Sequence, residues 1–130
     1  MKHYNVVAAV VCHDGKYLCM QKGKTKFEYT SYKWEFPGGK IEPGETPQQA
    51  LARELMEEME YPVEVGEELV TVNHEYLDFS ITMTAFLCTP KGDADGFKRR
   101  EHADSKWCSK DELKGLNWAA ADIDVVEGIL

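Results

Sequence analysis

The sequence has no long hydrophobic run and carries more negative than positive charge. No apolar segment approaches the roughly 20 residues that a membrane-spanning helix needs. The N-terminal segment lacks the features of a signal peptide, so a cytoplasmic location is expected. The 15 Lys and Arg residues stand against 23 Asp and Glu residues, which gives a net charge of −8. This net negative charge argues against a nucleic-acid polymer as a partner. A small polyanion can still bind if metal ions and a few nearby cationic side chains screen its charge.

Cysteine and histidine are scarce and scattered. The cysteines Cys12, Cys19, Cys88 and Cys108 have no CxxC spacing and are expected to be buried, reduced thiols. The four histidines form no cluster with ligand spacing, so a zinc site is not expected. At 130 residues, 43% of them hydrophobic and 29% charged, the chain is predicted to form one domain, residues 1–130, around a single core.

Hydrophobic patterning predicts a mixture of strands and helices. Strands are predicted over residues 6–12, 16–21, 34–36, 69–79, 81–89 and 106–108, with a short extended piece at 63–65. The two long strands are expected to meet at a tight turn near Phe79 and Ser80. Helices are expected from Pro47, from a Ser109 cap to Leu113, and over residues 121–130, whereas residues 23–33 and 91–101 are expected to be loops. This irregular alternation favours an α+β sandwich, a sheet covered by helices on two sides.

The segment from residue 39 to residue 61 is the most informative part of the chain. Thr46 is a suitable N-cap, Pro47 suits the first helical position, and Gln49 completes a capping box. On a helix, one arc collects the apolar side chains Leu51, Ala52, Leu55, Met56 and Met59. The opposite arc collects Ala50, Arg53, Glu54, Glu57 and Glu58. The apolar arc is predicted to pack on the core and the carboxylates to face a cleft.

The acidic arc runs against helix electrostatics. Glu54, Glu57 and Glu58 share one face and repel one another. Glu57, Glu58 and Glu60 also crowd the C-terminal end, where the helix dipole favours cations. A bound divalent cation would turn both penalties into attraction, and an ion pair with Arg53 could hold Glu57 in place. An ordinary solvated acidic face is the alternative, which the one-sided clustering and the preceding glycine-rich turn disfavour.

These residues resemble the motif of the Nudix hydrolases. That motif is Gly, five residues, Glu, seven residues, then Arg-Glu-aliphatic-any-Glu-Glu-any-Gly-aliphatic. The corresponding positions here are Gly39, Glu45, Arg53, Glu54, Leu55, Glu57, Glu58, Glu60 and Tyr61. The preceding WEFPGGK segment, residues 34–40, is similar to the entry of the motif in MutT-type members. The resemblance implies an α/β/α sandwich with a mixed sheet, in which the motif helix lines the cleft.

Two positions depart from the motif at the helix exit. Glu60 replaces the glycine that normally closes the helix in a left-handed conformation, which costs a glutamate about 1 kcal/mol. Tyr61 replaces an aliphatic residue. Because Tyr61 precedes Pro62, it is biased away from helical geometry and could end the helix instead. That would spare Glu60 the left-handed conformation.

The resemblance implies a magnesium-dependent nucleoside triphosphate pyrophosphohydrolase, with Mn²⁺ as a substitute ion. The metal ligands it implies are Glu54, Glu57, Glu58, Glu101 and the carbonyl of Gly38. The catalytic group would also include Arg53, and the general base stays open between Glu54 and Glu101. Glu45 is expected to hold the loop or the surroundings of the metal rather than to bind it directly.

Substrate recognition is less well specified. Lys22 and Lys40 are candidates to contact phosphate, with an exposed surface lysine as the alternative for Lys22. Phe36 is a candidate to stack on the base, although core packing is the commoner use of such a residue. Residues 117–123 resemble the MutT-like segment whose asparagine reads the base, and the resemblance implies that Asp122 occupies that position; the alternative is that Asp122 caps the last helix.

An ionised carboxylate accepts hydrogen bonds, so Asp122 would suit a base with an amino group, such as cytosine. The predicted substrates are therefore CTP or dCTP, their modified forms, or oxidised nucleotides such as 8-oxo-dGTP. Other nucleoside diphosphate derivatives and a non-catalytic nucleotide-sensing module are the alternatives. The expected partner is a small nucleotide, bound by a monomer or a weak homodimer.

Overall fold

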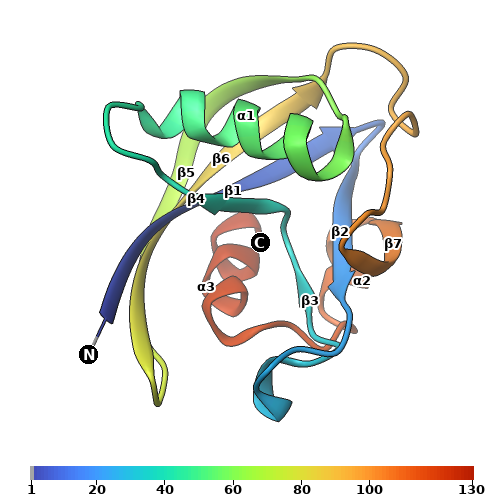
Figure 1. Cartoon of the computed structure of the whole chain (residues 1–130). Coiled ribbons are helices and arrows are strands. Elements are labelled where there is room, and N and C mark those ends of the chain that lie inside the picture. The colour runs from blue at the N-terminus through green and yellow to red at the C-terminus, as the bar shows by residue number, and fades with distance from the viewer. Residues whose placement is uncertain (1) are drawn as a thin grey trace.

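The computed structural model describes residues 2–130, and within them a mixed sheet of seven strands lies between helices (Figure 1). The strands are β1 (Lys2–His13), β2 (Lys16–Lys22), β3 (Trp34–Glu35), β4 (Gly38–Lys40), β5 (Val63–Glu75), β6 (Phe79–Pro90) and β7 (His102–Cys108). The helices are α1 (Pro47–Met59), α2 (Lys110–Leu113) and α3 (Ala120–Ile129), and a 3₁₀ turn, η1, spans Glu28–Thr30. The predicted α+β sandwich is confirmed.

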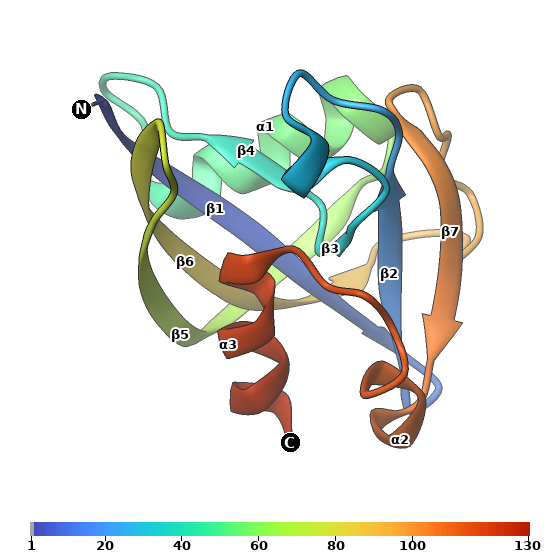
Figure 2. The same cartoon turned by 90° about the horizontal axis from the view of Figure 1, so that it is seen from below.

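Strand β1 is the centre of the sheet and is buried on both faces. The strand order is β3-β2-β1-β6-β5, with β4 also paired to β1 and β7 to β2. Strand β1 runs parallel to β6 and antiparallel to β2 and β4. Side chains alternate along β1, so that Val7 and Ala9 pack with α1 while Ala8 and Val10 pack with α3. Figures 1 and 2 show these two helices on opposite faces of the sheet.

Helix α1 begins as the sequence predicts. The Thr46 hydroxyl accepts a hydrogen bond from the Gln49 N–H at 3.1 Å, and the Gln49 side chain accepts one from the Thr46 N–H at 3.0 Å. This capping box satisfies two of the N–H groups that a helix start leaves unpaired. Pro47 occupies the first helical position. Local sequence therefore fixes where the motif helix starts.

The buried arc of α1 is rotated relative to the prediction. Its buried residues are Ala50, Leu51, Leu55 and Met59, whereas Met56 is 48% exposed. Ala50 was predicted on the carboxylate side and Met56 on the core side, and both predictions are wrong. The reason is that α1 packs against β4 as well as β1, which draws the Ala50 side of the helix inward. This rotation places Glu54 and Glu58 at the edge of the buried arc and leaves Glu57 outside it.

The exit of α1 also differs from the prediction, because Glu60 is left-handed, with φ 48° and ψ 42°. Tyr61 does not end the helix in its place. Tyr61 is instead buried, with its N–H bonded to the Leu55 carbonyl at 3.2 Å and its hydroxyl donating to the Ala94 carbonyl at 2.7 Å. Burying this ring beneath α1 requires the chain to reverse immediately after Met59, and Glu60 makes the reversal.

Two strand predictions are corrected by long-range pairing. Strand β5 is continuous from Val63, because it pairs with β6 along its length and absorbs two register shifts. The hairpin turn lies at residues 76–78 rather than at Phe79 and Ser80, and the Tyr76 N–H closes it by bonding the Phe79 carbonyl at 2.7 Å. The predicted short helix α2, capped by Ser109, is confirmed.

The state of the cysteines and the length of the apolar segments were also predicted from the sequence. All four cysteines are free thiols; Cys19, Cys88 and Cys108 are buried and Cys12 is partly exposed. None of the helices within residues 2–130 is both long enough and apolar enough to cross a membrane.

Candidate active site

Two glycines let the motif turn lie close to its neighbours. Strand β4 pairs with β1, and a Cβ atom on Gly38 would lie only 1.9 Å from the Val7 carbonyl oxygen. A Cβ on Gly39 would lie 2.4 Å from the carboxyl carbon of Glu54. No other residue type fits at either position without displacing something. The glycines therefore place the Glu54 carboxylate directly against the turn.

Arg53 organises the carboxylates around this turn. Its Nε and Nη2 donate to the two oxygens of Glu45 at 2.6 and 2.9 Å. Its Nη1 donates to Glu54 at 3.0 Å and to Glu57 at 3.1 Å, so the predicted pair of Arg53 with Glu57 is confirmed. Nη2 also donates to the Lys40 carbonyl at 3.1 Å. The hydrogen bonds from Arg53 hold the pKa of Glu45 below its usual value, so Glu45 stays ionised as the brace of the loop.

Glu58 is a partly buried carboxylate of the motif helix. Burial, followed by the hydrogen bond and charge of Glu54, raises the pKa of Glu58 to about 8, and the charge of Glu101 adds to this. Glu58 and Glu101 line one cavity of about 260 Å³ together with Gly38 and Lys22. Glu57 does not line this cavity and is 62% exposed. The structure thus brings Gly38, Glu58 and Glu101 to one cavity, whereas neither Glu54 nor Glu57 lines it.

The donors at this cavity fit a hard divalent cation. The charge of Glu54 raises the pKa of Glu58, so a cation bound between these carboxylates would relieve their mutual repulsion. Carboxylate and carbonyl oxygens are the ligands that Mg²⁺ prefers, and it retains water and substrate oxygens as further ligands. Glu58, Glu101 and Gly38 supply oxygen donors of that type at this cavity. Among residues 2–130, no three His, Cys, Asp or Glu side chains converge as a complete ligand set.

A second polar cluster was not predicted from the sequence. Glu35 receives a hydrogen bond from His102 Nε2 at 3.0 Å and pairs with Lys22 at 3.5 Å. The His102 side chain is 5% exposed, and its Nδ1 has no hydrogen-bond partner. Glu35 and His102 are 67 positions apart in the sequence, and only the pairing of β2 with both β3 and β7 joins them. No local signal could have indicated this cluster.

The two lysine candidates differ in placement. Lys22 lines the carboxylate cavity and also an adjoining one, where it could meet phosphate. The Lys40 ammonium lies 4.1 Å from the centre of the Tyr4 ring and lines none of the cavities described here. Its contact with phosphate stays a prediction that this geometry does not favour.

The adjoining cavity, of about 180 Å³, contains the candidate base-reading residues Phe36 and Asp122. Asp122 is 5% exposed, and its Oδ1 accepts a hydrogen bond from the Phe36 N–H at 3.0 Å. It lies inside the first turn of α3, whose N-cap is Ala119, so it is not the helix cap. Phe36 is 3% exposed and stacks on Trp118 at 4.8 Å, which makes its ring part of the core as well as of the cavity wall.

Burial also controls the charge of Asp122. Loss of water, followed by the charge of Glu35, raises its pKa to about 8, against the opposing effects of the Phe36 N–H and Lys22. At neutral pH the carboxyl therefore binds a proton for much of the time. The sequence predicts an ionised Asp122, whereas burial in the folded free protein favours the protonated carboxyl.

Replacing Asp122 with Asn is therefore expected to stabilise the fold with a particular pH dependence. The pKa of Asp122 in the folded protein lies above its ordinary value of 3.8, so the folded state binds the proton more tightly and stability falls as pH rises from about 4 to about 8. The neutral amide avoids this loss. Thermal denaturation should show a gain in Tm for Asp122→Asn that is larger at pH 8 than at pH 5. An equal gain at both pH values would contradict the burial argument.

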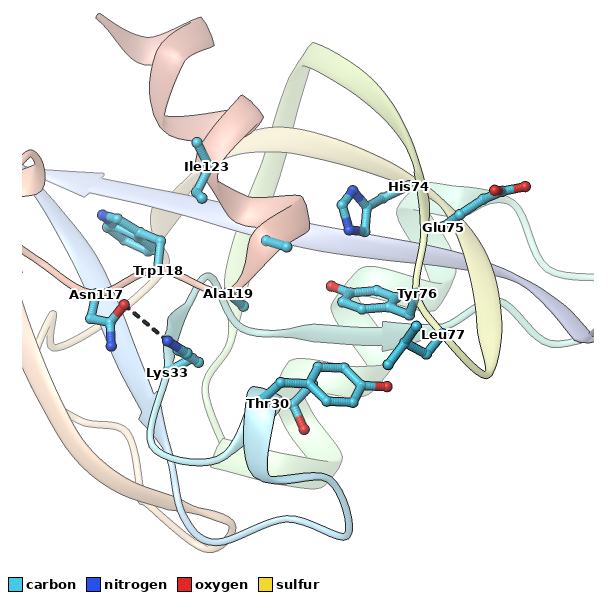
Figure 3. A pocket seen from close by; sticks show the side chains of 12 residues that line it. Thr30, Lys33, His74, Glu75, Tyr76, Leu77, Asn117, Trp118, Ala119 and Ile123 are labelled. Atoms are coloured by element: carbon cyan, nitrogen blue, oxygen red, sulfur yellow. Dashed lines mark hydrogen bonds between the residues drawn. The ribbon is translucent and has the colours of Figure 1, made fainter.

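A third cavity, of about 580 Å³, lies beyond the second and shares Thr30 and Tyr76 with it (Figure 3). One side carries the Lys33 ammonium, which donates to the Asn117 side chain at 3.1 Å. Tyr76 stands on the other side, with His74 next to it. The three cavities form a row from the carboxylates, past Asp122, to this larger and more apolar space.

This combination of a mixed sheet between helices and an arginine-braced glutamate helix beside a cleft defines a Nudix-type domain. The NUDIX domain family matches residues 1–127, and the chain belongs to that family. The CTP pyrophosphohydrolase of Escherichia coli (strain K12) is 36% identical over 131 residues, covering 100% of this chain and 93% of the relative. The 8-oxo-dGTP diphosphatase of Proteus vulgaris is 40% identical over 88 residues, covering 68% of this chain and 78% of the relative.

Solved structures agree with this assignment. The solution structure of the E. coli ORF135 protein superposes with a TM-score of 0.83 and 35% identity, covering 99% of this chain and 89% of that one. The crystal structure of the MutT protein from Methanosarcina mazei Go1 gives a TM-score of 0.82 and 25% identity, covering 97% and 91%. The relatives thus support the MutT-like resemblance within the family.

Proposed function

We propose that this protein is a magnesium-dependent pyrophosphohydrolase that cleaves a nucleoside triphosphate into a monophosphate and pyrophosphate. The observation that carries the proposal is the row of cavities, in which the space lined by Glu58 and Glu101 adjoins the space lined by Asp122. Lys22, Glu35 and Gly38 line both and mark the junction. A phosphate chain at the carboxylates would therefore place its nucleoside beside Asp122. Relatives named as a CTP pyrophosphohydrolase and an 8-oxo-dGTP diphosphatase support the same reaction class.

The chain's residues divide the chemistry between them. Glu54, Glu57, Glu58 and Glu101 with the Gly38 carbonyl would hold the metal, which neutralises phosphate oxygens and acidifies the attacking water when bound. Arg53 donates hydrogen bonds to Glu54 and Glu57 and so holds both carboxylates in position. Lys22 neutralises phosphate charge at the junction of the cavities. Glu54 and Glu101 are the candidates to accept the proton of the attacking water.

Asp122 is proposed to select the base through its second oxygen. Oδ1 is committed to the Phe36 N–H, so only Oδ2 is free to meet a base. When ionised, Oδ2 accepts a hydrogen bond, which suits the amino group of cytosine, whereas the corresponding NH₂ of an asparagine only donates. A base amino group would itself favour the ionised form of the carboxyl. CTP or dCTP is therefore the proposed preferred substrate.

Asp122→Asn tests this selection. The ratio of kcat/KM for CTP to that for 8-oxo-dGTP should fall by about tenfold or more, because the variant cannot accept from the cytosine amino group. Steady-state kinetics on both nucleotides would measure it, with circular dichroism confirming the fold. An unchanged ratio would remove Asp122 from base selection without affecting the proposed hydrolysis.

The 580 Å³ cavity favours a second candidate, the hydrolysis of a larger nucleoside diphosphate derivative. The 180 Å³ cavity is small for a nucleoside, and the larger space continues from it past Tyr76. A panel of nucleoside triphosphates, nucleotide sugars and dinucleoside polyphosphates, incubated with Mg²⁺ and analysed by chromatography for the nucleoside monophosphate released, separates the two candidates. Magnesium-dependent binding without turnover of any compound would instead favour a nucleotide-sensing module.

A further inference from the structure

The loop that leads to Glu101 is fastened to the end of helix α1 by Glu60. The Glu60 carboxylate pairs with the Lys98 ammonium at 3.0 Å and also with the Arg100 guanidinium. Arg100 Nη1 donates to the Glu57 carbonyl at 3.1 Å, and the Lys98 N–H donates to the Met59 carbonyl at 2.8 Å. Figure 1 shows this loop, between β6 and β7, passing the C-terminal end of α1. The side chain of Glu60 and two free carbonyls of α1 therefore hold the same short stretch of chain.

The left-handed backbone conformation of Glu60 suggests that its side chain has a role in the contact with Lys98 and Arg100. Any residue other than glycine pays about 1 kcal/mol for this conformation, so glycine would give the more stable helix end. A glutamate at this position retains the backbone strain, but its carboxylate forms ion pairs with Lys98 and Arg100 of the loop. In addition, the charges of Lys98 and Arg100 lie near the C-terminal end of α1, where the helix dipole attracts them. The Glu60 side chain thus stabilises the position of the loop rather than the end of α1.

Glu101 needs such a restraint. It follows Arg100 directly, is exposed, and lines the carboxylate cavity together with Glu58. An exposed side chain on a surface loop has many other conformations open to it, so its place at the cavity depends on what holds the loop. The attachment of Lys98 and Arg100 to Glu60 supplies that restraint.

We infer that Glu60 is a positioning residue that holds Glu101 at the metal cavity by binding Lys98 and Arg100. The inference rests on the proposed function, because it takes Glu101 as a metal ligand. Glu60 itself touches neither metal nor substrate. Glu60 preorganises Glu101, which lies on a surface loop. Less conformational entropy is then lost when the metal binds.

Two substitutions of Glu60 separate positioning from helix capping. Glu60→Gly removes the carboxylate and the backbone strain, whereas Glu60→Gln removes only the charge. Both should raise the Mn²⁺ dissociation constant about three- to tenfold, the range of one or two exposed ion pairs, as measured by electron paramagnetic resonance of free Mn²⁺. Glu60→Gly should nevertheless have a Tm at least as high as that of Glu60→Gln. The control is Glu64→Gln, which removes an exposed carboxylate paired with Lys91 at the other end of the loop and should leave Mn²⁺ binding unchanged.

Hydrogen exchange gives a readout that does not involve the metal. The Lys98 amide is bonded to the Met59 carbonyl, so it should exchange faster in both Glu60 variants than in the wild type or in Glu64→Gln. Unchanged exchange at Lys98 would overturn the inference.

A double-substitution cycle tests whether Glu60 acts through Glu101. Glu101→Gln should weaken Mn²⁺ binding, and adding Glu60→Gly to it should cause no further loss. Additive losses, or normal Mn²⁺ affinity in Glu60→Gly, would overturn the inference. If Glu58→Gln weakens Mn²⁺ binding while Glu60→Gly does not, only the positioning role fails. If Glu58→Gln binds Mn²⁺ with wild-type affinity, both the positioning role of Glu60 and the proposed function fail.

Discussion

Replacing Glu58 with Gln is expected to lower kcat by at least about two orders of magnitude while leaving the fold intact. Glu58 is the motif carboxylate that lines the cavity with Gly38 and Glu101, and an amide cannot supply the negative charge that a divalent cation needs there. The substitution is nearly isosteric, and burial beside Glu54 already favours the uncharged form of Glu58, so a neutral amide should cost the free protein little stability. Turnover with Mg²⁺ and Tm without it would be measured together.

The matched control for this substitution is Glu67→Gln, an exposed carboxylate on β5 away from the cavities. It should leave both kcat and Tm unchanged. The companion variant Glu57→Gln should also lose at least about two orders of magnitude of kcat, because Glu57 is proposed as a metal ligand. Near wild-type turnover in Glu58→Gln would refute the site, whereas near wild-type turnover in Glu57→Gln alone would limit the ligands to the cavity-lining group.

The second large effect is expected from the paired glycines of the motif turn. A Cβ at position 39 would meet the Glu54 carboxylate at 2.4 to 2.5 Å, and a flexible side chain can move away. Gly39→Ala should therefore fold normally but turn over at least about a hundredfold more slowly, because Glu54 is pushed out of place. The variant should also bind Mn²⁺ more weakly.

Gly38→Ala should behave differently. Its Cβ would lie 1.9 Å from the Val7 carbonyl oxygen, which is backbone of the central strand and cannot move aside. The pairing of β4 with β1 should be disrupted, and the variant should lose thermal stability as well as turnover. Differential scanning calorimetry with a turnover assay distinguishes the two variants. If Gly39→Ala kept full activity, the close contact between the turn and Glu54 would have no role in catalysis.

The sequence predicted the local features of the motif correctly because their determinants lie within a few residues of one another. The capping box joins Thr46 to Gln49, and the pair of Arg53 with Glu57 spans one helical turn. The direction of the buried arc could not be predicted in the same way. It depends on β4 packing beside α1, and that contact draws Ala50 inward and leaves Met56 exposed.

The cluster of Glu35, His102 and Lys22 shows why part of the site was missed. Its members come from β3, β7 and the end of β2, which become neighbours only when the sheet forms. The protonation of Asp122 was missed for a related reason. Its pKa follows from burial beneath Phe36 and from the charge of Glu35, and neither is adjacent in sequence.

The sequence by itself determined the family motif, the helix that carries it and the types of side chain offered to a metal, because spacing along one helix sets those relations. Only the tertiary structure decided which carboxylates share a cavity, that Glu60 turns left-handed to bury Tyr61, and that Asp122 meets Phe36 beside the candidate metal site. Those outcomes depend on burial and on charges brought together from distant strands, and such quantities exist only once the sheet and its helices have packed.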